Sequence, residues 1–161
     1  MPLELHPHLR ALAPLLGAWQ GRGTGEYPTI EPFEYLEEVV FSHVGKPFLV
    51  YGQKTKDAAD GASLHAETGY LRVPRPGQVE LVLAHPSGIT EIEVGSYTAE
   101  GATVELEMTA TQIGTTPTAK DVTALGRRFR LDGDTLSYSL EMGAVGQPTQ
   151  HHISAVLHRR D

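Results

Sequence analysis

Cysteine is absent from the 161-residue chain. Its absence excludes disulfides, thiolate metal sites, cysteine nucleophiles and covalent attachment of a c-type haem. The chain also lacks a run of about 18 apolar residues, so no transmembrane helix is expected. Its first residues, Met1-Pro2-Leu3-Glu4, lack the basic and apolar segments of a signal peptide. These absences lead us to expect a cytoplasmic protein.

Basic residues are also few, since 13 Lys and Arg stand against 20 Asp and Glu and give a net charge of −7. Nucleic acids and anionic membranes are bound by basic surfaces, so neither is an expected partner. The length is near the typical domain size of about 150 residues, which predicts a single domain over residues 1–161. The sequence leaves the oligomeric state open, with a homodimer as one option.

Helical patterns are nearly absent from the chain. Apolar residues recur at helical spacing in residues 6–16, where Pro14 interrupts them, and we expect one or two short helical turns there. Further along, apolar residues recur at every second position, which is the pattern of a half-buried strand. The clearest such face, in residues 135–142, consists of Leu136, Tyr138, Leu140 and Met142.

Turn sequences such as Asp60-Gly61 and Asp132-Gly133 separate these alternating segments. Ten strands are expected, at 18–24, 33–44, 47–57, 63–73, 78–85, 88–98, 102–112, 119–131, 134–142 and 150–159. In the second of them a charged residue, Glu37, falls on the apolar face. Many short strands at hairpin spacing predict an all-β sandwich or antiparallel barrel. A barrel of about eight strands holds one small ligand, so ten strands would enclose a wider cavity.

Eight histidines are the main candidates for acid–base or metal chemistry in a chain without cysteine. We expect His6 and His8, near the terminus, and His43 and His85, beside turns, to lie at the surface. His65 begins a strand and is expected at the rim of the barrel. Spacings typical of a catalytic Ser-His-Asp triad or a phosphate-binding loop are absent, so hydrolase and kinase functions have no support.

His151 and His152 open the last expected strand, so their side chains point to opposite faces and one of them faces inward. The period alone leaves open which one, although the apolar face of Ile153 and Leu157 favours His151. An inward imidazole bonded to a carbonyl or to water is one interpretation. The other is a metal ligand, because one neutral imidazole is enough to hold a haem iron.

The first expected strand contains Gly17, Trp19, Gly21 and Gly23 at alternate positions. A large indole among glycines predicts a plug that closes one end of a barrel, around which the strand can bend. Fatty-acid carriers and lipocalins use a comparable device, so this feature by itself predicts packing and no chemistry.

The Gly17-x-Trp19-x-Gly21-x-Gly23 run resembles the nitrobindin family, as do the segment around Leu64-His65 and the ending from Gly146 to His158. The resemblance covers nearly the whole chain and is closest to mycobacterial and related actinobacterial members. It implies a ten-stranded antiparallel β-barrel like those of fatty-acid-binding proteins and lipocalins, with a short N-terminal helix. It also implies one b-type haem per chain with iron as Fe(III).

The resemblance implies that His152 is the axial iron ligand and the catalytic residue. This conflicts with the alternation of the strand, in which Ile153 and Leu157 share a face with His151. A β-bulge after Pro148, or a helix packed outside the barrel, would reconcile the two. The resemblance also places Lys120 beside a haem propionate. The other residues that it places around the haem or in the cavity wall are Thr29, Leu64, His65 and Met142.

The activity implied by the resemblance is that of a haem-dependent peroxynitrite isomerase, which converts peroxynitrite to nitrate and also binds nitric oxide reversibly. A barrel that carries an apolar ligand such as a fatty acid is the first alternative, since the first-strand tryptophan fits it equally well. A haem-based nitric oxide sensor is the second alternative.

Overall fold

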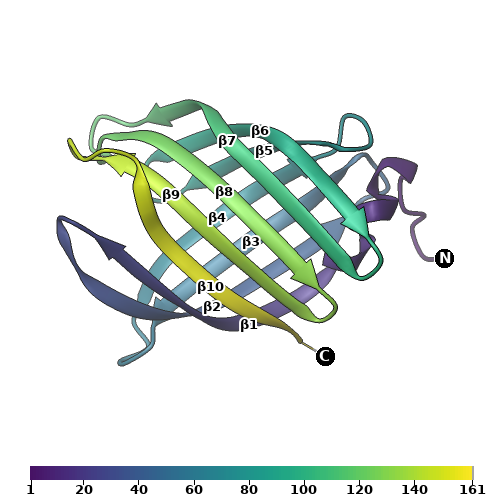
Figure 1. Ribbon diagram of the computed structural model, residues 1–161, viewed down its shortest axis with the longest axis horizontal. Coiled ribbons are helices and arrows are strands. Elements are labelled where there is room, and N and C mark those ends of the chain that lie inside the picture. The colour runs from purple at the N-terminus through teal and green to yellow at the C-terminus, as the bar shows by residue number, and fades with distance from the viewer. Residues whose placement is uncertain (161) are drawn as a thin grey trace.

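The computed structural model describes residues 1–160, and within them ten strands form a closed antiparallel barrel (Figure 1). A short 3₁₀ helix, η1 (Pro7–Leu15), precedes them. The strands are β1 (Gly17–Tyr27), β2 (Ile30–His43), β3 (Phe48–Asp57), β4 (Ser63–Arg72), β5 (Gln78–His85), β6 (Ile89–Glu100), β7 (Thr103–Thr115), β8 (Val122–Asp132), β9 (Thr135–Ala144) and β10 (Gln150–Arg160). The expected all-β barrel with a short N-terminal helix is confirmed. The predicted domain ends at Asp161, which lies outside the described residues.

Each strand pairs with the next one in the chain, and β1 also pairs with β10 to close the ring. All ten strands expected in residues 1–160 are present, with ends that differ by a few residues. One difference concerns the candidate site, because β8 begins at Val122 and not at residue 119. Lys120 therefore lies in the β7–β8 loop. Within residues 1–160, no helix is both long and apolar enough to cross a membrane.

One end of the barrel is closed by η1, which lies at the right of Figure 1. Its three leucines, Leu9, Leu12 and Leu15, are buried in the main core together with Trp19. The indole Nε1 of Trp19 donates a hydrogen bond of 2.9 Å to the carbonyl of Leu15. On the indole lies the guanidinium of Arg159, 4.3 Å from the ring centroid. The predicted plug is confirmed.

The glycines of β1 allow close approach of neighbouring chain segments. A Cβ at Gly21 would overlap the carbonyl oxygen of Val156 and come within 2.8 Å of the Leu157 Cα on the paired strand. At Gly23, a Cβ would overlap the ring of Tyr35. Glycine at these two positions lets β1 lie between β2 and β10 while a tyrosine ring packs across it.

Candidate functional site

The end of the barrel away from η1 holds a cavity of about 630 Å³. Its rim comes from the β1–β2, β5–β6, β7–β8 and β9–β10 connections, represented by Thr29, Ser87, Lys120 and Val145. At the opposite end of the barrel, η1 contacts the β4–β5 connection, where the ring of His8 bonds to the carbonyl of Val73. The volume falls within the range of about 300–1,000 Å³ usual for ligand sites. The barrel therefore has one closed end and one ligand-sized cavity at its other end.

All six residues that the sequence predicts around a haem line this cavity, and they are Thr29, Leu64, His65, Lys120, Met142 and His152. Thr29 and Lys120 are exposed at the rim, whereas Met142 is partly buried on β9. Further apolar side chains, among them Val122, Leu125 and Leu140, belong to a buried cluster beside the cavity. The structure thus brings the predicted residues together, and their contacts with a haem stay predictions.

A β-bulge decides which histidine of the pair faces inward. His151 pairs with Glu141, but Ile153 already pairs with Leu140, so His152 is the extra residue of the bulged strand. The extra residue lets His152 and Ile153 both line the cavity, while His151 is exposed. The parity argument for an inward His151 is therefore wrong, because alternation fails across a bulge.

His152 has a fixed tautomer in this structure. Its Nδ1 lies 2.9 Å from the carbonyl oxygen of Glu26, and since a carbonyl can only accept, Nδ1 carries the proton. Nε2 is then the nitrogen with a lone pair. Burial lowers the pKa of His152 below its ordinary value, which keeps the ring neutral at neutral pH. The Tyr27 ring packs edge-on at 5.3 Å between centroids and restricts the imidazole further.

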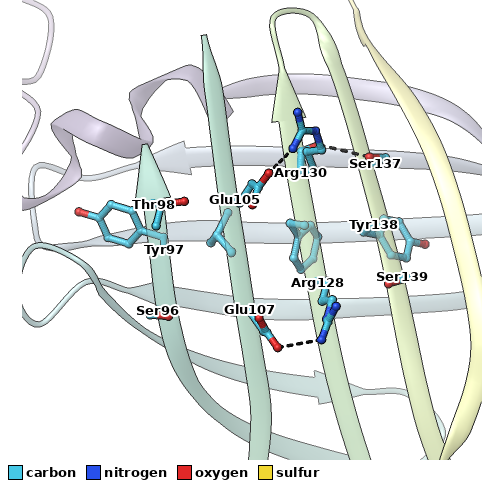
Figure 2. Close-up of a pocket in the computed structure, with 12 residues that line it drawn as sticks. Ser96, Tyr97, Thr98, Glu105, Glu107, Arg128, Arg130, Ser137, Tyr138 and Ser139 are labelled. Carbon is cyan, nitrogen blue, oxygen red and sulfur yellow. Dashed lines mark hydrogen bonds and ion pairs between the residues drawn. The ribbon is translucent and has the colours of Figure 1, made fainter. Parts of the chain in front are cut away.

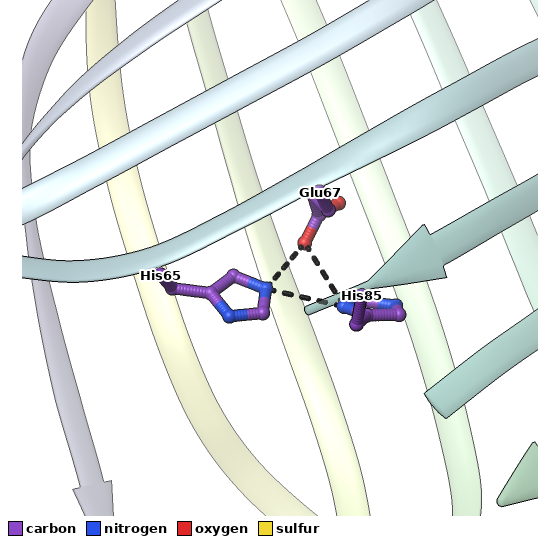
Figure 3. A group of neighbouring side chains, drawn as sticks. All are labelled: His65, Glu67 and His85. Atoms are coloured by element: carbon purple, nitrogen blue, oxygen red, sulfur yellow. Dashed lines mark hydrogen bonds and ion pairs between the residues drawn. The ribbon is translucent and has the colours of Figure 1, made fainter. Parts of the chain in front are cut away.

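A second group of side chains lies on β4 and β5: His65, Glu67 and His85 (Figure 3). His65 Nε2 is 3.1 Å from His85 Nδ1 and 3.3 Å from Glu67 Oε1. The expectation that His85 lies at the surface is wrong, since its side chain is 8% exposed. Its Nε2 points inward and donates a 2.7 Å hydrogen bond to Glu91.

Arg127 on β8 links this group to three buried carboxylates. It bonds to Glu67 at 2.7 Å, to Glu91 at 2.5 Å and to Glu93 at 3.1 Å. Burial alone would raise the pKa of Glu67, but the Arg127 guanidinium, His65 and His85 together outweigh burial and lower it to about 2. Burial and the neighbouring Glu91 raise the pKa of Glu93. At neutral pH the charge of Arg127 is therefore matched mainly by Glu67 and Glu91.

Glu37 lies in a separate buried network on β2. The Tyr138 hydroxyl donates to its Oε1 at 2.6 Å, and the Gln53 amide donates to its Oε2 at 2.9 Å. Tyr35 joins the network through the Tyr138 hydroxyl at 2.9 Å. Burial raises the pKa of Glu37 to about 7, with a smaller opposing effect from these hydrogen bonds.

A second pocket, of about 420 Å³, lies over the outer face of β6 to β9 (Figure 2). Its charged side chains form exposed pairs, Arg128 with Glu107 at 3.0 Å and Arg130 with Glu105. Exposed ion pairs of this kind contribute about 0–1 kcal/mol and leave no free charge for a ligand. The inner cavity is therefore the candidate site.

The buried charges at the floor of this cavity were not expected from the sequence. Glu91, Arg127 and His85 line it, and Glu67 is buried behind them. One signal was available, because Glu67 and Arg127 fall on the apolar faces of their strands, as Glu37 does on β2. A charged residue at an inward position needs a partner or a proton, and only the folded barrel shows which.

The chain is similar to a known protein family, to named bacterial proteins and to a solved structure. The family described as "THAP4-like, heme-binding beta-barrel domain" matches residues 8–159. A protein named peroxynitrite isomerase 2 from Mycobacterium avium is 73% identical, and one from Mycobacterium marinum is 75% identical, each over 99% of both chains. The crystal structure of Rv2717c from M. tuberculosis is 67% identical, with a TM-score of 0.96 over 98% of this chain and 100% of that one.

Proposed function

The chain belongs to the family of THAP4-like, heme-binding β-barrel domains, and we propose that it isomerises peroxynitrite to nitrate with one b-type haem held by His152. The proposal extends to a ferric iron and to reversible binding of nitric oxide by the same haem. Relatives that are 73% and 75% identical carry the name peroxynitrite isomerase 2, which supports the reaction.

The observation that carries the proposal is the preset tautomer of His152. Histidines that bind a metal usually donate their other ring N–H to a carbonyl or carboxylate, which fixes the ring and leaves one lone pair. His152 already has this arrangement through Glu26, and it lines a cavity of about 630 Å³ with apolar walls. His65 and His85 also line the cavity but bond to each other, so His152 offers a lone pair beside the apolar wall, which is the donor that a haem iron uses. The residues present therefore fit the group.

The other cavity residues would contact the edge of the porphyrin and line the entrance of the cavity. Lys120 lies exposed at the rim, where an ammonium can pair with a propionate. Leu64, Met142 and Ile153 form part of the apolar wall, which would limit water around a bound haem. A bound ferric haem would supply Lewis-acid chemistry, which suits a rearrangement that keeps every atom of peroxynitrite.

The test is a titration of the full chain with hemin, for wild type and for His152→Ala. We expect a Soret band typical of histidine-ligated ferric haem in the wild type and a loss of hemin affinity of at least tenfold in His152→Ala. Haem-loaded wild type should also accelerate the decay of peroxynitrite and protect free tyrosine from nitration.

The matched control is His151→Ala, which removes the neighbouring exposed imidazole and should keep the wild-type spectrum and affinity. An unchanged spectrum in His152→Ala would show that another side chain binds the iron. Equal binding of a fluorescent fatty-acid analogue by wild type and His152→Ala, without a Soret band in either, would favour the apolar carrier instead.

A further inference from the structure

The wall of the barrel that faces His152 contains a second set of ligand atoms. In the ring of strands, β5 lies five strands from β10 in either direction, so the two are opposite each other. His85 ends β5, and its neighbour β4 carries His65 and Glu67 (Figure 3). These three side chains therefore lie across the cavity from His152 and do not share its strand or its hydrogen bonds.

The three ligand atoms have the spacing of a metal site. His65 Nε2, His85 Nδ1 and Glu67 Oε1 form a triangle with edges of 3.1, 3.3 and 3.9 Å. A point at equal distance from the corners of such a triangle lies about 2.0 Å from each atom, which matches zinc–nitrogen and zinc–oxygen bonds. Little movement is needed to bind an ion there.

The surroundings of the triangle hold two of its ligands, His85 and Glu67, in the state that a metal ion requires. His85 Nε2 donates to Glu91 at 2.7 Å, so the lone pair of His85 is on Nδ1, the corner of the triangle. Glu67 Oε2 accepts hydrogen bonds from Arg127 at 2.7 Å and from Tyr51 at 3.0 Å, whereas Oε1 faces the two histidines and accepts only a longer bond of 3.5 Å from Arg127. His65 Nε2 is the corner that carries a proton without metal, and a shift of that proton to Nδ1 frees its lone pair.

Charge and access are also suitable for a cation. Arg127 is the one positive group of this network and pairs with two ionised carboxylates, Glu67 and Glu91, so the network favours a further cation. The side chain of His65 is 37% exposed, and both His65 and His85 line the cavity, which gives an ion a path to the site. A fourth coordination position would open into the cavity.

We propose that His65, Glu67 and His85 form a site for a divalent transition-metal ion of the zinc type, separate from the iron ligand His152. Two imidazoles and one carboxylate are a donor set that zinc uses where it keeps an open position. The site stands on the geometry of β4 and β5 and does not depend on the proposed haem chemistry.

The test measures Zn²⁺ binding to the haem-free full chain by calorimetry, with Co²⁺ absorption to report tetrahedral coordination. We expect one ion per chain for wild type. His65→Ala and His85→Gln should each weaken Zn²⁺ affinity at least tenfold, with unchanged far-ultraviolet circular dichroism. Glutamine at position 85 can still donate to Glu91, and in His65→Ala the buried Glu67 keeps its bonds to Arg127 and Tyr51, so both variants should fold.

Two matched variants separate this site from the haem ligand. His152→Ala and His158→Ala, the latter an exposed histidine of β10, should keep wild-type Zn²⁺ affinity. Wild-type affinity in both His65→Ala and His85→Gln would overturn the proposal, as would loss of Zn²⁺ binding in His152→Ala. Loss of hemin binding in His152→Ala tests the proposed function alone, so failure of either proposal is recognised separately.

Discussion

Glu37 shows how a single buried residue couples this fold to pH. Its side chain is 2% exposed, and burial raises its pKa to about 7. Between its ordinary value of 4.5 and that value, the folded chain keeps a proton that the unfolded chain loses. The folded state binds more protons in this window, so the free energy of unfolding falls as pH rises through it.

We predict that Glu37→Gln removes this fall. The amide keeps the shape of the protonated side chain and can donate to Gln53 Oε1, a buried atom without a hydrogen-bond partner in the described chain. From pH 4.5 to 7, wild type should lose about 3 kcal/mol more stability than the variant, from 1.36 kcal/mol per pKa unit. Urea denaturation at a series of pH values measures the difference.

The control for that experiment is Glu34→Gln, which changes an exposed carboxylate on the same strand. It should follow the wild-type pH dependence. Parallel curves for wild type and Glu37→Gln would mean that Glu37 titrates normally in the folded barrel.

At the scale of elements, two irregular strands build the iron ligand's surroundings. β10 has its extra residue at His152, and the register of β1 with β2 shifts between Gly25 and Tyr27. The residue inside that second shift, Glu26, supplies the carbonyl that fixes the His152 tautomer. Regular strands would not place these two groups together, so the site depends on departures from the ideal sheet.

The close pairing of β1 with β10 predicts that a side chain added to β1 destabilises the barrel. Gly21→Ala should lower the free energy of unfolding by about 2 kcal/mol or more, because its Cβ would overlap backbone atoms of β10 that cannot rotate away. Guanidinium denaturation of the haem-free chain measures the loss.

The matched variant is Gly52→Ala on β3, where a Cβ would meet nothing within 4 Å. Its stability should be equal to wild type or slightly higher, since alanine costs less backbone entropy than glycine in a strand. Equal denaturation midpoints for Gly21→Ala and Gly52→Ala would contradict the steric account.

On the scale of the whole molecule, the barrel separates stability from ligand binding. The closed end packs η1 and Trp19 into the main core, and the open end holds the cavity with His152, Lys120 and the β4–β5 group. Because the apolar side chains at the closed end and those beside His152 belong to two different buried clusters, changes at one end should add to changes at the other. The family assignment agrees with this division, and it confirms the resemblance to nitrobindins read from the sequence.

Thermal unfolding tests whether the closed end and the cavity end of the barrel behave independently. Hemin at about 100 times its Kd should stabilise wild type by about 2.7 kcal/mol, which raises the Tm of a chain of this size by about 5–10 °C. Trp19→Phe, which removes the bond to Leu15, should lower the Tm with and without hemin but keep the same shift. A shift that disappears in Trp19→Phe would show that the two ends are coupled.

The amino-acid sequence by itself determined the repeating elements of this protein. Alternating apolar residues and turn pairs such as Asp132-Gly133 are local signals, so they sufficed to predict ten strands, and the Trp19 run predicted the closed end. The six candidate cavity residues came from resemblance to a family, and they do line one cavity.

Tertiary structure decided what depends on partners distant in the sequence. The choice of His152 over His151 rests on a bulge that shows only in the register with β9. The inward position of His85 rests on Glu91 across a hairpin and on His65 from the neighbouring strand. A buried polar group is placed by the groups that neutralise or bond to it, and alternation along one strand contains no information about them.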